Sequence, residues 1–363
     1  MLKKISLILI IFLQLSLTAC TEVIELSQKL VVQGIGIDKS DIGCKVTFQI
    51  LNVKQSPDKD SGEQKEVQIL KANGNTLVDA IENIRKQTGR DALLSQVLVL
   101  VIGDEMAKSG IRPFVDYFIR HHGLSPSIEV AVSKGEAEEI LRAQKGEEPI
   151  SSEEILSVLQ MGLNDNRKLN FNLGKFISSI ESYEDAKVHY IEDKKDGEDS
   201  CLMANKVAVF KKDKFIGPLN EEETRGFLLI KGKIKKIVDI VELSDGSKVT
   251  YVTSNIKSDI KVFEENQELK LLVSTKAKTY VSESEIDIAL DDRFDEIKEK
   301  IENRMKNLIK TALEKTIYEY KADIIGISKR LSEIKGKMLR LDEETYDNIK
   351  CSVSTKVELN LIK

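Results

Sequence analysis

The stretch AVFKKDKFIGPLNEEETRGFLLI, residues 208–230, combines a turn signal and a helix start in one short segment. Its first apolar residues predict a strand, and the charged residues 211–214 predict a four-residue hairpin loop before the return strand. Asn220 is then expected to cap a short helix, with Glu223 at the N3 position. The stretch therefore predicts a strand pair that leads directly into a capped helix.

The run of three glutamates at 221–223 has two interpretations. Clustered carboxylates could bind a divalent cation. Acidic residues in a first helical turn are also stabilised by the helix macrodipole, and Asn220 with Glu223 fits a capping box. We therefore interpret the run as structural and predict no metal site there.

The same region also holds candidates for partner binding, because an apolar hairpin meets a capped helix. The alternative, that its apolar side chains only fill the core of their own domain, stays open for each of them. The candidates are Phe215, Leu219, Glu222, Arg225 and Phe227.

Downstream of this stretch the sequence predicts strands and one long helix. Residues 291–326 predict the longest helix, whose apolar stripe is broad and whose repeat is too short for a coiled coil, so we expect it to pack on a sheet. The residues 244–247, Ser-Asp-Gly-Ser, predict a turn between two strands. The alternating apolar segments predict strands over 236–243, 248–263, 269–281 and 348–363.

Upstream, predicted strands and helices alternate. Residues 76–89 predict an amphipathic helix, with Thr76 in a sequence that resembles a capping box and Gly89 as its stop. The continuous apolar run SQVLVLVIG, residues 95–103, predicts a strand that is buried on both faces. The other segments are strands over 31–37, 45–53 and 127–135 and helices over 111–120, 136–144, 151–161 and 173–182.

This order of elements predicts an α+β fold with three mixed domains, in which antiparallel or mixed sheets pack against helices. The charged, glycine-containing residues 193–200 are expected to form a domain boundary. The predicted parts are a signal peptide over 1–19, an N-terminal mixed domain over 20–195, a small middle domain over 200–250 and a C-terminal α+β domain over 251–363.

The glycines of Gly34-Ile35-Gly36 do not indicate a dinucleotide-binding loop. The third glycine of that fingerprint would fall at Lys39, and a strand rather than a helix follows. We interpret Gly34 and Gly36 as strand positions where another backbone comes close.

Residues that commonly carry chemistry are few and scattered. The pair His121-His122 falls at a predicted helix end, where solvated histidines interact with the last carbonyls, and the third histidine is His189. No CxxC spacing marks a zinc site and no GxSxG marks a nucleophile elbow. We therefore predict no enzyme activity, no metal and no cofactor, and interpret three cysteines as packing residues: Cys44, Cys201 and Cys351.

The first residues have the layout of a secretory signal. Lys3 and Lys4 precede an apolar run that is shorter than a membrane-spanning helix requires. The run ends in Leu-Thr-Ala-Cys at Cys20, which looks like a bacterial lipoprotein signal. We expect Cys20 to be lipidated after cleavage and to hold the protein to the outer face of a membrane.

Charge excludes nucleic acid as a predicted partner. Removal of Lys3 and Lys4 with the leader leaves 53 basic residues against 60 acidic residues. No basic patch or arginine-rich run stands out along the sequence. A mildly acidic protein is weakly repelled by an anionic membrane, so we expect the lipid on Cys20 to supply the attachment.

Three stretches together resemble one family, the C subunits of spore germinant receptors, which are Ger(x)C-type lipoproteins. The first stretch is Cys20 with Glu25-Leu26 and the strand ending Gly-Ile-Gly-Ile-Asp at Asp38. The second is 208–230, and the third is Ala-Asp-Ile-Ile-Gly at 322–326. Thr21-Glu22 stands where the family has Trp-Asp, so the sequence departs from the pattern directly after the cysteine.

The resemblance implies a three-domain α+β protein on the outer face of the spore inner membrane. Its implied partners are a membrane-spanning A subunit and a transporter-like B subunit, which together respond to nutrient germinants. An anchored, acidic protein without a reactive centre is expected to act as a scaffold or docking component. The alternative is a solute-binding lipoprotein of an importer, but the sequence shows no repeat of two similar α/β lobes.

Overall fold

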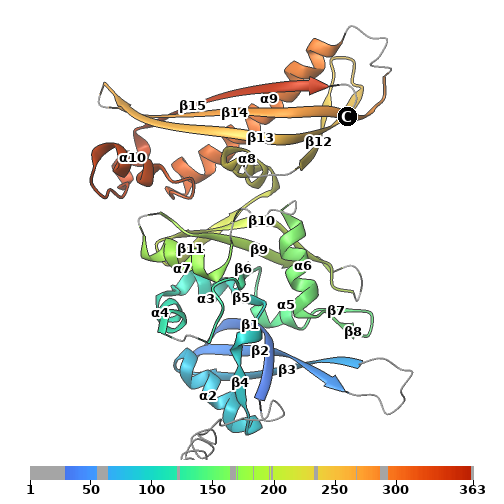
Figure 1. Ribbon diagram of the computed structural model, residues 1–363, viewed down its shortest axis with the longest axis vertical. Helices are drawn as coiled ribbons and strands as arrows, with labels where there is room; N and C mark the ends of the chain where they lie inside the picture. Colours follow the sequence, from blue (N-terminus) through green and yellow to red (C-terminus); the bar gives the residue numbers. More distant parts are fainter. Residues whose placement is uncertain are drawn as a thin grey trace, which may run out of the picture.

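The computed structural model describes two sheets with their helices. The described residues are 29–54, 64–120, 123–163, 169, 171–182, 184–195, 197, 199–232, 236–266, 268–286 and 293–360. The predictions for Cys20, His121 and His122 therefore lie outside the described residues. Figure 1 shows an elongated molecule, with the N-terminal sheet in the lower part and the C-terminal sheet at the top.

The first sheet has nine strands in the order β11-β10-β9-β6-β5-β1-β2-β3, and β4 pairs with β1 off this path. Its centre is parallel, because β1, β5, β6 and β9 run in one direction, and its two ends are antiparallel hairpins. The strands are β1 (Lys29–Ser40), β2 (Gly43–Lys54), β3 (Gln64–Gly74), β4 (Asp91–Leu93), β5 (Val99–Gly103), β6 (Glu129–Ser133), β9 (Lys187–Asp193), β10 (Leu202–Lys211) and β11 (Lys214–Leu219).

Helices cover both faces of this sheet. Alternate residues of β5 show it: Leu100 and Ile102 belong to one hydrophobic cluster, and Val99 and Val101 belong to another. Every residue of β5 is buried, as the continuous apolar run predicts. The helices are α2 (Leu77–Thr88), α3 (Asp104–Ser109), α4 (Arg112–Arg120), α5 (Ala137–Leu141), α6 (Ser152–Gly162) and α7 (Leu173–Glu181), with the short η2 (Leu94–Gln96) and the hairpin β7 (Gln144–Lys145) and β8 (Glu148–Pro149).

The second sheet has four strands in the order β12-β13-β14-β15. Strands β12 to β14 form an antiparallel meander, and β15 returns parallel to β14 after the helices. The elements are β12 (Lys236–Glu242), β13 (Lys248–Glu265), β14 (Glu268–Ser284), α9 (Phe294–Leu313), the π-helical η5 (Glu314–Glu319), α10 (Ile327–Lys335), α11 (Glu343–Asp347) and β15 (Ile349–Asn360).

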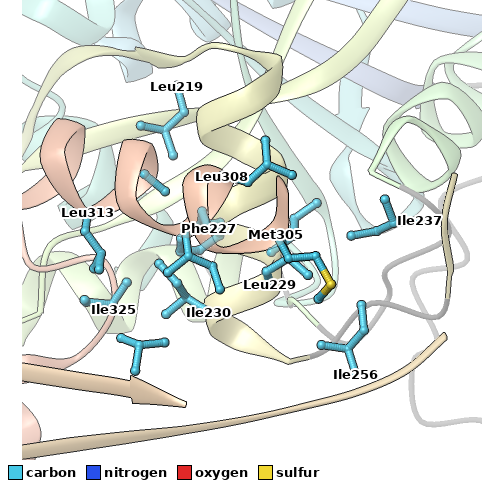
Figure 2. Close-up of a cluster of buried hydrophobic side chains, with 14 of the residues drawn as sticks. Leu219, Phe227, Leu229, Ile230, Ile237, Ile256, Met305, Leu308, Leu313 and Ile325 are labelled. Atoms are coloured by element: carbon cyan, nitrogen blue, oxygen red, sulfur yellow. The ribbon is translucent and has the colours of Figure 1, made fainter. Parts of the chain in front are cut away.

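Helix α8 (Glu221–Lys231) joins the two halves. It packs against α9 and also contacts both β10 of the first sheet and β13 of the second. Gly226 allows the close crossing, because a Cβ atom there would lie 1.9 Å from the carbonyl oxygen of Leu308 on α9. Figure 2 shows Phe227 and Leu229 of α8 packed against Met305 and Leu308 of α9.

The α+β class and the mixed sheets predicted from the sequence are confirmed. The long C-terminal helix forms as α9 and continues as η5 to Glu319, so it ends before the predicted end at residue 326. The two elements bury the broad apolar stripe: Ile297, Ile301, Met305, Leu308, Ile309, Ala312, Leu313 and Ile317. Because these side chains face α8 and the second sheet, the helix packs on a sheet as the breadth of its stripe indicates.

The described residues of the segment 200–250, expected to form a small middle domain, contribute strands to both sheets. Strands β10 and β11 extend the first sheet through backbone bonds to β9, whereas β12 starts the second sheet. The stretch 193–200, expected to separate domains, links β9 to β10, which are paired neighbours in one sheet. The charged composition of 193–200 therefore marks a loop and not a domain boundary in the sheet. The backbone hydrogen bonds between β9 and β10 continue the first sheet on both sides of this loop.

Candidate functional site

The capped helix α8 has the geometry that its sequence predicts. The side chain of Asn220 accepts a hydrogen bond from the backbone N–H of Glu223 at 2.9 Å, and the carboxylate of Glu223 accepts one from the N–H of Asn220 at 2.7 Å. Gly232 ends the helix in the left-handed conformation. Among the described residues no group of carboxylates, histidines or cysteines is arranged to hold a metal ion.

Three of the five candidate partner-binding residues are internal. Phe215 is 5% exposed, and Leu219 and Phe227 are fully buried. Leu219 and Phe227 lie in the core between α8, α9 and the second sheet, while Phe215 packs in the core of the first sheet. The alternative interpretation, that they fill the core, is therefore the one that the structure supports, because a buried side chain offers no surface to a partner.

The other two candidates lie in an ion-pair network at the surface. Arg304 of α9 contacts Glu222 at 2.7 Å and Asp239 at 3.1 Å, and Asp239 also accepts a hydrogen bond from Arg225 at 3.1 Å. The network connects α8, α9 and β12. Binding of a partner through Glu222 and Arg225 stays a prediction.

A pair of buried aspartates holds the two halves of the molecule together. Asp185, which precedes β9, accepts hydrogen bonds from the backbone N–H of Asp323 at 2.8 Å and from Arg340 at 2.9 Å. Asp323 in turn accepts three backbone N–H groups at the start of α10, those of Gly326, Ile327 and Ser328, at 2.7–2.8 Å. The Ala-Asp-Ile-Ile-Gly stretch is thus a cap and a joint between the halves.

Two lysines lie beside this joint in unfavourable surroundings. Burial lowers the pKa of Lys231 to about 7 and the pKa of Lys187 to about 8; the positive charge of Lys187 lowers the pKa of Lys231 further, and that of Lys175 lowers the pKa of Lys187. The ammonium of Lys231 donates to the carbonyl of Ile325 at 3.3 Å. These lysines make the joint between the halves sensitive to pH.

The Gly-Ile-Gly-Ile-Asp stretch also has a structural role. The carboxylate of Asp38 accepts the backbone N–H groups of Ala137 at 2.6 Å and Glu138 at 3.0 Å, at the start of α5. A Cβ atom on Gly34 would lie 2.5 Å from the hydroxyl of Ser152 on α6. Side chains of α5 and α6, rather than a backbone, make the close approach that was expected at the two glycines.

Charged side chains surround the start of α5. Lys45 contacts Glu136 and Glu138, both at 2.8 Å, and Lys71 contacts Glu138 at 2.7 Å. Burial would raise the pKa of Glu138, but Lys45, Lys71 and Arg142 together hold it at about 2. Each carboxylate of this cluster has a partner, so the cluster stabilises the α5 end of the first sheet.

A hollow of about 530 Å³ lies at the carboxyl ends of β1 and β5. Ligands commonly bind at this edge of a sheet with parallel strands. Most of its acidic groups are engaged, however: Asp38 caps α5, and Asp104 and Glu105 both contact Lys108 at 2.9 Å. A second hollow, of about 610 Å³, lies between α2, α4 and the β1–β2 turn and is lined largely by apolar atoms.

The described histidine and cysteine residues do not converge on one site. His189 is buried, with its Nε2 atom 3.3 Å from the carboxylate of Glu129 and its ring against Phe171. Cys44 is buried, as a packing residue should be, but Cys201 is exposed. The interpretation of Cys201 as a packing residue was wrong, because it lies in the link between β9 and β10 and not on a covered face.

The fold and the polar clusters described above define an α+β protein with two large sheets. In the described residues, these clusters mainly connect the protein's own helices and strands. Models of spore germination proteins match almost the whole chain. The N-terminal domain of spore germination proteins matches residues 22–193, and the spore germination B3/GerAC-like C-terminal domain matches residues 205–363. The chain belongs to this family of spore germination proteins.

Named relatives agree with this assignment. YfkR of Bacillus subtilis (strain 168), named as a spore germination protein, is 24% identical over 360 residues, which cover 96% of this chain and 87% of YfkR. The spore germination protein YndF of the same organism is 24% identical over 302 residues, covering 78% of this chain and 72% of YndF. The crystal structure of the GerBC protein has the same fold, with a TM-score of 0.58 and 16% identity over 90% of this chain and 96% of that chain.

Proposed function

We propose that this protein is the C subunit of a nutrient germinant receptor and acts in spore germination as a docking component. The observation that carries the proposal is the match of both halves, residues 22–193 and 205–363, to models of spore germination proteins. The shared fold with GerBC supports it. The proposed partners are the membrane-spanning A subunit and the transporter-like B subunit.

A docking role is consistent with how the described residues use their polar groups. Buried carboxylates such as Asp185 and Asp323 accept backbone N–H groups, and Asp38, which lines the first hollow, also accepts two backbone N–H groups. A rigid folded surface needs such internal bonds, whereas a general base needs a free carboxylate within reach of a substrate. We therefore propose that the protein contributes surfaces and not a reaction.

We propose further that a lipid on Cys20 attaches the protein to the outer face of the spore inner membrane. Among the described residues no helix is long and apolar enough to cross a membrane. Confinement to the membrane raises the effective concentration of the partner subunits, so modest contacts suffice for assembly. Replacement of Cys20 by Ala should leave an unprocessed precursor and abolish lipid labelling.

Deletion of the gene tests the function. Spores without this protein should respond slowly or not at all to nutrients, while germination by nutrient-independent routes stays intact. Re-expression of the natural chain should restore the response, and re-expression of the Cys20→Ala variant should restore it poorly. Normal nutrient germination in the deletion strain, in the absence of a second gene of the same family, would overturn the proposal.

A further inference from the structure

The outer face of the second sheet carries an array of lysines. Along β14 the residues alternate between buried and outward-facing, so Leu271, Val273 and Thr275 face the helices while Lys270 and Lys276 face outward. Neighbouring strands add further outward lysines in register. We call this set the lysine face; it consists of Lys257, Lys261, Lys270, Lys276, Lys278, Lys350 and Lys356. Three of these lysines have acidic partners, because Lys261 pairs with Asp259, Lys270 with Glu265 and Lys278 with Glu358.

One row of this face places three lysines directly opposite one another. Lys276 on β14 pairs with Lys257 on β13 and with Lys356 on β15. All three are exposed, and among the described residues no carboxylate lies within ion-pair distance of any of them. Like charges in directly opposed positions of a sheet are destabilising, so this row lowers the stability of the folded protein.

Solubility alone does not require such a row. A solvent-facing surface is normally built with both signs interspersed, and α9 does this with Lys298, Glu299, Lys300 and Glu302 in close succession. Lysines are also used to protect the edges of sheets, but Lys276 lies on the inner strand β14. The row therefore has the composition of a surface that meets negative charge.

The neighbouring residues indicate what kind of negative charge. Between the lysine rows lie Ser274, Ser352 and Ser354, whose hydroxyls can donate hydrogen bonds to phosphate oxygens. Phe263, which is 42% exposed, lies beside Lys270 at one end of the face. Aromatic rings next to basic residues are typical of surfaces that meet a lipid headgroup layer.

The shape of the face favours a lipid surface over other anions. Strand spacing sets Lys257, Lys276 and Lys356 about 5 Å apart across three strands, and the pair Lys270 and Lys350 lies about 20 Å further along the same face. Nucleic acids are usually bound by arginine and by several stacking rings in a groove, whereas this face contains no arginine. A row of lysines on the flat face of a sheet suits a layer of anionic headgroups, to which each unpaired lysine adds on the order of a fivefold gain in binding.

We propose that the lysine face binds the anionic headgroups of a phospholipid membrane. The inference goes beyond the proposed function, because it places a membrane contact in the described residues and is independent of lipidation at Cys20. Helices α8 and α9 cover the opposite face of the sheet, so among the described residues the lysine face is turned away from the helices.

Vesicle binding tests the inference. The chain from residue 21 onward, produced without the apolar leader and the acylation site, is mixed with vesicles of phosphatidylcholine alone or of an equal mixture with phosphatidylglycerol. We expect tighter binding to the mixed vesicles and weakening by added salt. A triple variant, Lys257→Gln with Lys276→Gln and Lys356→Gln, should bind the mixed vesicles on the order of 100-fold more weakly.

A matched variant separates the lysine face from net charge. Lys145→Gln with Lys310→Gln and Lys337→Gln removes the same charge from exposed positions elsewhere and should bind nearly as the parent does. Equal losses in the two triple variants would overturn the inference, as would equal binding of the parent to both kinds of vesicle. Binding to polyglutamate but not to mixed vesicles would assign the face to an acidic protein instead, and would leave the germination test unaffected.

Discussion

The two sheets of this protein differ in how many of their faces are covered. The first sheet has a parallel centre, and helices cover it on both sides, so the residues of β5 are all buried. The second sheet is covered by α8 and α9 on one side, and its strands alternate between buried and outward-facing residues. The comparison shows which parts of each sheet can contact a partner: the first sheet presents mainly loops and strand ends, whereas the second presents a whole face.

The largest expected effect is at the helix crossing that covers the inner face of the second sheet. Gly226→Ala should lower the free energy of unfolding by about 3 kcal/mol or more, because the added methyl group would overlap the carbonyl of Leu308 and separate α8 from α9. Gly123→Ala is the control, since a Cβ atom there meets nothing within 4 Å. Similar urea midpoints for both variants would show that the crossing is looser than described.

The next effect is at the joint between the two sheets. Asp323→Ala should cost about 3 kcal/mol, because it leaves three buried N–H groups without their acceptor. Asp342→Ala removes an exposed helix cap of α11 and should cost about 1 kcal/mol. Equal losses of unfolding free energy in the two variants would mean that burial of the joint contributes little to stability.

The same joint predicts a pH dependence. The folded-state pKa of Lys231 is about 7, lowered by burial and by Lys187 and Arg330 despite the nearby Glu184 and Asp323. Above this pKa and below about 10.5 the unfolded chain holds a proton that the folded chain lacks, so stability from this group rises with pH across that window. Lys231→Met should be more stable than the natural chain at about pH 7, with the difference shrinking toward about pH 10. A pH-independent difference in urea unfolding would contradict the assignment.

The local elements could be predicted from the sequence because their signals are local. Asn220 with Glu223 and Thr76 with Gly89 stand at fixed positions relative to their own helices, and the structure places each of them at the predicted helix end. Apolar periodicity likewise predicted α9, whose buried stripe follows one helix face.

Features that depend on register could not be predicted in this way. Lys257, Lys276 and Lys356 lie far apart in the chain, and only the pairing of three strands brings them into one row. No basic patch is therefore visible along the sequence. Phe215 and Phe227 illustrate the opposite case, since their apolar character alone does not distinguish a core position from a docking surface.

The smallest expected effect is on the lysine face itself. Lys276→Thr should raise the free energy of unfolding by about 0.5 kcal/mol, because it relieves repulsion from Lys257 and Lys356 and places a β-branched residue in a central strand. Lys261→Thr should raise the free energy of unfolding by less, because the residue opposite Lys261 on β14 is Leu272 and not a lysine. A loss of stability at Lys276 would argue that the row is not under electrostatic strain.

The central claim is that this protein works by holding partner subunits at the membrane. Affinity purification of the tagged chain from detergent-solubilised spore membranes tests it most directly. We predict that the membrane-spanning A and B subunits co-purify with the chain in a fixed ratio. Recovery of the chain without either subunit would contradict the claim. Normal assembly of the A and B subunits in spores that lack the chain would contradict it as well.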